Sequence, residues 1–116
     1  MAVQIRPGQA LRLWHDVFLA LVRADEPDLS ARQMTVLITI YLDPQPHTVR
    51  ALAGKLGVTK PVITRALDTM GRYGLVTRKR DPEDRRNVLV QRTVEGALFL
   101  ERLGDLIVTQ AAALPA

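Results

Sequence analysis

The chain has 116 residues and a net charge of +4, and its length predicts a single domain spanning 1–116. Apolar residues make up 47% of the composition, which suits a chain that folds around a core. Cysteine is absent, which excludes disulfides, thiol catalysis, iron–sulfur clusters and cysteine-based zinc sites. The apolar runs are far shorter than the roughly 20 residues of a membrane helix, and the N-terminus lacks a signal-peptide pattern. We therefore expect a cytoplasmic protein with no membrane partner.

The basic residues are concentrated in one part of the chain. Residues 48–92 contain eleven Lys and Arg but four Asp and Glu, a net charge of +7, whereas the rest of the chain carries −3. A DNA duplex carries one negative charge per roughly 1.7 Å of its axis, so a basic segment gains affinity for it by displacing counterions. The charge alone is equally compatible with a solvated surface that has no partner.

Two helices are predicted in the first part of the chain. Residues 9–24 carry apolar side chains at three- and four-residue spacing, without Gly or Pro, which is typical of an amphipathic helix. Ser30 and Gln33 have the spacing of a capping box, so we expect a second helix in residues 30–42. Two prolines that follow this segment prevent the helix from continuing.

Residues 48–73 are predicted to form a helix-turn-helix. Thr48 has the residue type of an N-cap for a short first helix, and Gly57 is a suitable left-handed end for it. Thr59 is a second N-cap candidate, and Pro61 falls in the first turn of the second helix, where a missing N–H costs nothing. Two short helices joined by a turn with glycine, the second rich in polar and basic side chains, are typical of this motif.

The period then changes from helical to strand-like. Residues 75–92 contain two strand-like runs on either side of a polar turn at 81–86, which predicts a β-hairpin. Thr93 is an N-cap candidate for a last helix over 94–112. The predicted fold is mainly α with a small β-hairpin wing, an α+β winged helix-turn-helix.

Three short motifs in this region are more specific than the helix-turn-helix alone. They are GLV at 74–76, RDPEDRR at 80–86 and TVEG at 93–96. With these motifs at this spacing, residues 48–103 resemble the MarR-type winged helix-turn-helix transcriptional regulators. Arg92 stands where the family usually has leucine before the threonine.

The resemblance implies a function in transcription. It implies a sequence-specific, double-stranded DNA-binding regulator, a repressor that binds a roughly palindromic operator as a homodimer. Two alternatives remain open: a winged-helix module that docks on an acidic protein surface, and a nonspecific DNA-coating protein. We do not expect an enzyme, because the sequence shows no Ser-His-Asp order, paired carboxylates or Gly-rich phosphate loop.

The second helix of a helix-turn-helix presents its N-terminal residues to base edges in the major groove. The residues expected there are Lys60, Pro61, Val62, Thr64, Arg65 and Asp68. Arg65 can contact guanine O6 and N7, but it could instead pair with Asp68 at i+3. Lys60 can reach either a guanine or a phosphate. Val62 could contact a thymine methyl group or belong to the core.

The hairpin turn is expected to reach the minor groove. Asp84 and Arg86 match the family's Asp-x-Arg, and the resemblance implies that the aspartate orients the arginine in the groove, with Arg85 beside it near phosphate. The alternative is a solvated tip held by an Asp84–Arg86 ion pair. Residue types that suit phosphate contacts are Thr48, Arg50, Thr59, Arg72 and Arg78. The two threonines among them could serve only as helix caps.

Members of the family dimerise through the N-terminal helix and two C-terminal helices, so the resemblance implies a homodimer. The apolar residues expected at its interface are Leu11, Trp14, Phe18, Leu21, Leu98, Phe99, Leu103, Leu106 and Ile107. These side chains could instead form the core of a monomer. Because one C-terminal helix follows the wing here, we expect a reduced dimer face and effector pocket, which leaves a small-molecule effector open.

No cofactor is expected. The two histidines, His15 and His47, do not form a metal-ligand set without cysteine, so no metal site is predicted.

Overall fold

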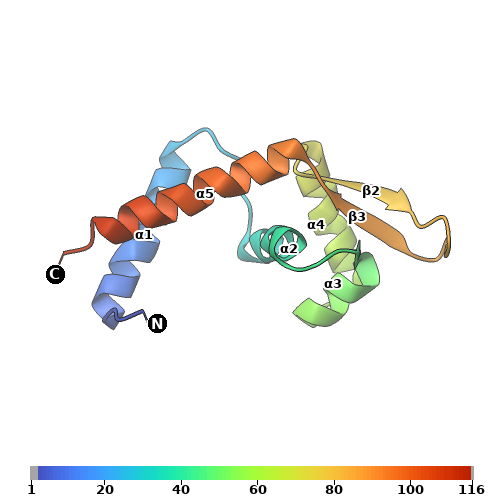
Figure 1. Ribbon diagram of the computed structural model, residues 1–116, viewed down its shortest axis with the longest axis horizontal. Helices are drawn as coiled ribbons and strands as arrows, with labels where there is room; N and C mark the ends of the chain where they lie inside the picture. Colours follow the sequence, from blue (N-terminus) through green and yellow to red (C-terminus); the bar gives the residue numbers. More distant parts are fainter. Residues whose placement is uncertain (1–2, 116) are drawn as a thin grey trace. The chain divides into compact units, whose positions relative to one another are not determined.

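The computed structural model describes residues 3–115, within which five helices and three short strands form (Figure 1). In chain order they are α1 (Pro7–Arg23), α2 (Ala31–Leu42), β1 (His47–Thr48), α3 (Val49–Leu56), α4 (Lys60–Arg72), β2 (Val76–Arg80), β3 (Val88–Arg92) and α5 (Val94–Ala112). This is the mainly α fold with a hairpin wing that the sequence predicts.

Contacts between residues divide the chain into two compact units. The winged unit comprises residues 29–100 and holds α2, α3, α4, the sheet and the start of α5. The helical unit comprises the described parts of 1–28 and 101–116, with α1 and the rest of α5.

The winged unit contains the buried core. Its core cluster consists of Val36, Leu37, Ile40, Val49, Leu52, Ala53, Ile63, Ala66, Leu67, Met70, Leu75, Val76, Val90 and Phe99. The members on α2 and on α4 recur at three- and four-residue spacing, so each helix turns one apolar stripe inward. Burial of each large side chain contributes about 1.5–3 kcal/mol, which fixes α4 on the rest of the unit.

Side chains at the predicted helix starts satisfy free backbone N–H groups. Ser30 Oγ accepts from Gln33 N at 3.1 Å and Gln33 Oε1 accepts from Ser30 N at 2.8 Å, which confirms the capping box. Thr48 Oγ1 accepts from Ala51 N at 3.0 Å. The turn between α3 and α4 begins at Gly57, whose φ of 68° is left-handed.

Two helix starts differ in detail from the sequence expectations. Thr59 occupies the N-cap position of α4, as predicted, but its side chain makes no capping hydrogen bond, and its carbonyl accepts from the N–H groups of Val62 and Ile63. The first helix begins at Pro7 rather than at residue 9, because Pro7 fits the first turn and Gln9 Oε1 accepts from Arg6 N at 2.9 Å.

The three strands form one antiparallel sheet in the order β1-β3-β2. In the wing, Val76 pairs with Arg92 and Arg80 pairs with Val88. The two-residue strand β1, which the sequence did not indicate, pairs His47 with Val90. This pairing attaches the start of the helix-turn-helix to the wing.

Tyr41 on α2 joins the base of the wing to the start of α5. Its hydroxyl donates to the Leu75 carbonyl at 2.8 Å and accepts from Thr93 N at 2.9 Å. Thr93 Oγ1 accepts from Gly96 N at 2.9 Å, as expected of an N-cap, and donates to the Gly74 carbonyl at 2.7 Å. A Cβ at Gly96 would collide with the Tyr41 hydroxyl and the Leu75 carbonyl, so this position requires glycine.

Arg92 on β3 binds the end of α2. Its Nε donates to the Ile40 carbonyl at 2.8 Å and its Nη2 to the Asp43 carbonyl at 3.0 Å, while the guanidinium lies over the Tyr41 ring. Cationic side chains stabilise helix C-termini by bonding the last carbonyls. The residue that departs from the family pattern thus fastens the wing to α2.

The helical unit buries few apolar side chains. Among its described residues, Val17 and Leu103 are the only apolar residues that are buried. Glu26 binds Arg102 through two hydrogen bonds of 3.0 and 3.2 Å, and the Gln9 amide donates to the Pro115 carbonyl. Neither unit contains, in its described part, a helix long and apolar enough to cross a membrane.

Candidate nucleic-acid interface

The start of α4 exposes polar and basic side chains because the helix buries its opposite face. Lys60, Pro61, Thr64 and Arg65 are all exposed, whereas the core cluster takes Ile63, Ala66, Leu67 and Met70 from the same helix. Four of the six predicted major-groove residues therefore share one accessible face. Val62 is half-buried and lies outside the core cluster, at the edge of this face.

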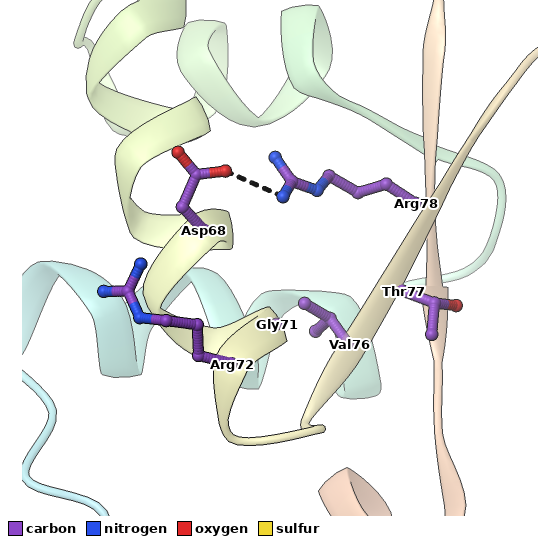
Figure 2. A pocket seen from close by; sticks show the side chains of 6 residues that line it. All are labelled: Asp68, Gly71, Arg72, Val76, Thr77 and Arg78. Carbon is purple, nitrogen blue, oxygen red and sulfur yellow. Dashed lines mark ion pairs between the residues drawn. The ribbon is translucent and has the colours of Figure 1, made fainter.

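Asp68 pairs with the wing rather than with its own helix. Its Oδ1 lies 2.7 Å from Nη2 of Arg78 on β2, and both side chains are partly exposed (Figure 2). Among the described residues the ion pair of Asp68 is with Arg78, and the alternative Arg65–Asp68 pair is not formed in this structure. Arg65 makes no ion pair with any described residue.

An open hollow of about 530 Å³ lies where α4 meets β2. It is lined by Asp68, Gly71, Arg72, Val76, Thr77 and Arg78 (Figure 2). Arg72 points away from the Asp68–Arg78 pair, and its Nη2 donates to Thr69 Oγ1 at 3.3 Å. Of the two arginines predicted to contact phosphate here, Arg78 is thus held by an aspartate, and Arg72 is exposed.

Asp84 holds Arg86 at the wing tip through both carboxylate oxygens. Arg86 Nε donates to Oδ1 at 3.0 Å, Nη2 donates to Oδ2 at 3.1 Å, and the backbone N of Arg86 also donates to Oδ1. These hydrogen bonds, together with the charge of Arg50, lower the pKa of Asp84, and the carboxylate raises the pKa of Arg86. A carboxyl group with a lowered pKa loses its charge only in acid, so the pair persists at neutral pH.

The pair leaves most of the arginine accessible. The Arg86 side chain is 82% exposed and that of Asp84 37%. The sequence left two alternatives for this turn, an Asp84–Arg86 ion pair and an arginine oriented for DNA. In the free protein both correspond to the same geometry. Arg85 is also exposed.

Three residues that shape the wing tip, Arg80, Asn87 and Asp81, were not among the predicted site residues. Arg80 Nη1 donates to the Arg85 carbonyl at 3.1 Å, and Asn87 N donates to the Asp84 carbonyl at 2.9 Å. Asp81 Oδ1 accepts from Glu83 N, which closes the turn. The signal available in the sequence was the Asp-Pro turn itself, because aspartate side chains often bond the backbone two residues on.

The remaining residues predicted to contact phosphate differ in how available their side chains are to a ligand. Thr48 is committed to its cap, whereas Thr59 is exposed without a capping bond. Arg50 is exposed on the first turn of α3.

The predicted dimer residues fall into two groups. Leu11, Trp14, Phe18, Leu98 and Ile107 are exposed, and Leu21 and Leu106 are half-buried. Phe99 belongs to the core cluster of the winged unit, and Leu103 is also buried within the chain. The expectation that these two face a partner is corrected, because their side chains are already covered. Val22 and Val108 are exposed apolar residues of the helical unit that the prediction missed.

Each histidine contacts a nearby aspartate residue. His15 Nδ1 is 2.9 Å from Asp16 Oδ1, and the buried His47 has its Nε2 3.1 Å from the Asp43 carbonyl. Asp43 also accepts from Lys55 Nζ at 2.7 Å, which lowers the pKa of the carboxyl group. Within residues 3–115, no group of three potential metal ligands comes together.

The sequence model of the MarR family matches residues 29–88. The organic hydroperoxide resistance transcriptional regulator of Bacillus subtilis (strain 168) is 32% identical over 82 residues, which cover 71% of this chain and 55% of the relative. The chain thus spans about half the length of the curated relatives it matches.

Solved structures share the fold over most of the chain. The transcriptional repressor CouR, bound to a 23-mer DNA duplex, has a TM-score of 0.71 at 24% identity and covers 96% of this chain and 84% of its own. A mutant of MarR from E. coli has a TM-score of 0.68 at 26% identity, over 96% of this chain and 82% of its own. With the family model matching more than half of its residues and this fold in common, the chain belongs to the MarR family.

Proposed function

We propose that the protein is a sequence-specific, double-stranded DNA-binding transcriptional regulator that represses by covering an operator. One observation carries the proposal: the winged unit exposes a polar and basic face at the start of α4 and an arginine held by a carboxylate at the wing tip. Two comparisons support the proposal: CouR, which shares the fold, is bound to a DNA duplex, and the Bacillus relative is a transcriptional regulator. The curated relatives are transcriptional regulators of a bacterium, and bacterial DNA lies in the cytoplasm, so we propose the cytoplasm as the location.

In this account α4 reads the major groove. Arg65 has no ion-pair partner among the described residues, so its guanidinium is available for a bidentate contact with guanine O6 and N7. Thr64 on the exposed face, or Val62 at its edge, contacts a thymine methyl group. Asp68 is held by Arg78, and its base contact requires that this exposed ion pair open.

The wing inserts Arg86 into the adjacent minor groove. Asp84 restricts the rotamers of the long arginine side chain before DNA arrives, so less conformational entropy is lost on binding. A narrow minor groove concentrates negative potential and attracts such a side chain. Arg85 and the exposed Arg72 supply charge for neighbouring phosphates.

We further propose a homodimer in which all of residues 1–116 act as one DNA-binding domain. The helical unit exposes Leu11, Trp14 and Phe18 on one helix, with the Trp14 and Phe18 rings 5.0 Å apart. A unit that buries so little of its apolar surface within the chain is stabilised by a second copy. A two-fold dimer places two α4 helices about one DNA turn apart, which favours an inverted repeat.

In vitro selection from a random duplex library at physiological salt tests the proposal. We expect enrichment of an inverted repeat, which also supplies the operator. Enrichment of a single half-site would retain the DNA contacts but contradict the dimer. Salt-sensitive binding without enrichment would favour the DNA-coating protein, and no binding would favour the protein-docking module.

A further inference from the structure

A second, smaller cavity lies within the winged unit, with a volume of about 180 Å³. The residues that line it are Val49, Arg50, Lys60, Thr64, Arg86, Asn87 and Val88. They come from the first turn of α3, the first turns of α4, and the segment that leads from the wing tip into β3. The cavity therefore lies between the helix expected in the major groove and the wing expected in the minor groove.

The charge around this cavity is positive and largely uncompensated. Each of its three walls contributes one cation: Arg50, Lys60 and Arg86. Asp84 neutralises Arg86, but Arg50 and Lys60 make no ion pair with any residue in the described part of the chain. Arg50 is nevertheless close enough to Asp84 to favour its charged form. Two cations are thus left facing a cavity whose lining residues include no acid.

We propose that this cavity, the phosphate pocket, binds one backbone phosphate of the DNA strand that separates the two grooves. The inference rests on the proposed function. Neighbouring major and minor grooves share one sugar–phosphate strand as their common wall. A protein that inserts α4 into one groove and its wing into the other must straddle that strand, and the phosphate pocket is the cavity between those two elements.

The residues of the pocket match the chemistry of a phosphodiester. Arg50 offers a planar fork of N–H donors, and Lys60 offers a compact charge. The Thr64 hydroxyl and the Asn87 amide add neutral donors. The larger hollow beside β2 is less suited to an anion, because Asp68 lies in its wall and already satisfies Arg78.

The assignment selects the phosphate contact from the two roles that the sequence leaves open for Lys60. In the phosphate pocket this side chain contributes equally to binding of every sequence, and the choice among bases is left to Arg65 and its neighbours. A phosphate held from both sides also fixes the spacing between α4 and the wing on the duplex. The pocket thus sets the register of the complex.

The experiment compares Lys60→Ala, Arg50→Ala and Lys60→Arg with the native protein on a selected operator and on a scrambled duplex. Arg32→Ala, which removes an exposed charge of α2 outside the pocket, is the matched control. We expect Lys60→Ala and Arg50→Ala each to weaken binding about tenfold on both duplexes and to lower the salt slope by about one. Lys60→Arg retains most of the affinity, and Arg32→Ala changes little.

A neutral methylphosphonate placed at each operator position in turn identifies the phosphate. We expect one position in each half-site at which neutralisation weakens native binding and at which Lys60→Ala causes no further loss. If Lys60→Ala instead relaxes the preference at one base pair, or if its effect adds to that of every methylphosphonate, the pocket is contradicted while the proposed function stands. If the native protein binds neither duplex, the proposed function fails, and the pocket fails with it.

Discussion

At the scale of single residues, the Asp84–Arg86 pair links a sequence motif to a contact. Three hydrogen bonds from one arginine converge on one carboxylate, although both groups are at the surface. An exposed pair like this adds little to the stability of the fold. Its value lies in orienting the guanidinium before DNA binds.

Replacing Arg86 by alanine is expected to weaken DNA binding roughly 10- to 100-fold, as loss of a good groove contact does. Asp84→Asn retains the size of the side chain and the charge of Arg86 but loses the ionic hold, so we expect a smaller loss. Fluorescence anisotropy with labelled duplex measures both, and circular dichroism confirms folding. Equal affinity of native protein and Arg86→Ala would contradict the minor-groove assignment.

Arg65→Ala is expected to relax the base preference at one position in each half-site, because Arg65 has no ion-pair partner in the described part of the protein and faces outward. Repeating the selection with the variant measures this directly. Arg72→Ala, on the same helix, is the matched control and should retain the native preference. A uniform loss of affinity for all sequences would instead make Arg65 a phosphate contact.

Gly96 is a residue whose identity is fixed by contact rather than by backbone conformation. Gly96→Ala places a methyl group against the Tyr41 hydroxyl and the Leu75 carbonyl, and we expect it to lower the free energy of unfolding by about 1–3 kcal/mol. Gly54→Ala is the control: its Cβ meets nothing within 4 Å, so helix propensity should stabilise the protein by up to about 1 kcal/mol. Urea denaturation compares the two, and equal stabilities would contradict the contact.

At the scale of elements, local features were predictable and distant ones were not. The capping pair of Ser30 and Gln33, and the turn at Gly57, depend on residues within four positions of each other. Their chemistry is therefore visible in a short stretch of sequence. The same holds for the wing turn, whose Asp84 and Arg86 are two residues apart.

The features that sequence reasoning missed depend on partners far apart in the chain. Arg92 binds a carbonyl on α2 that is 52 residues away, and β1 is a two-residue strand defined only by its pairing with β3. Asp68 had a basic neighbour on its own helix, yet the hairpin brought Arg78 closer. A phenylalanine suits a dimer interface as well as a core, so the sequence did not distinguish the two for Phe99. The packing of the winged unit shows that Phe99 belongs to the core.

At the scale of the whole molecule, the helical unit leaves several large apolar side chains exposed, and a second copy of the chain would cover them. Trp14→Glu is expected to dissociate a homodimer, because it places a charge among side chains that would be buried by the second copy. Leu42→Asp changes another highly exposed apolar residue, in the winged unit, and should leave the dimer intact. Sedimentation velocity at tens of micromolar measures the mass, and a native species of 12.9 kDa would contradict the dimer.

We propose that the winged unit recognises particular DNA sequences rather than charge alone. A pair of anisotropy titrations of the native protein at physiological salt tests this, one with the selected operator and one with a scrambled duplex of the same composition. We expect the operator to bind about 10³-fold more tightly than the scrambled duplex, as in specific protein–DNA complexes. Equal affinity for the two duplexes would contradict it.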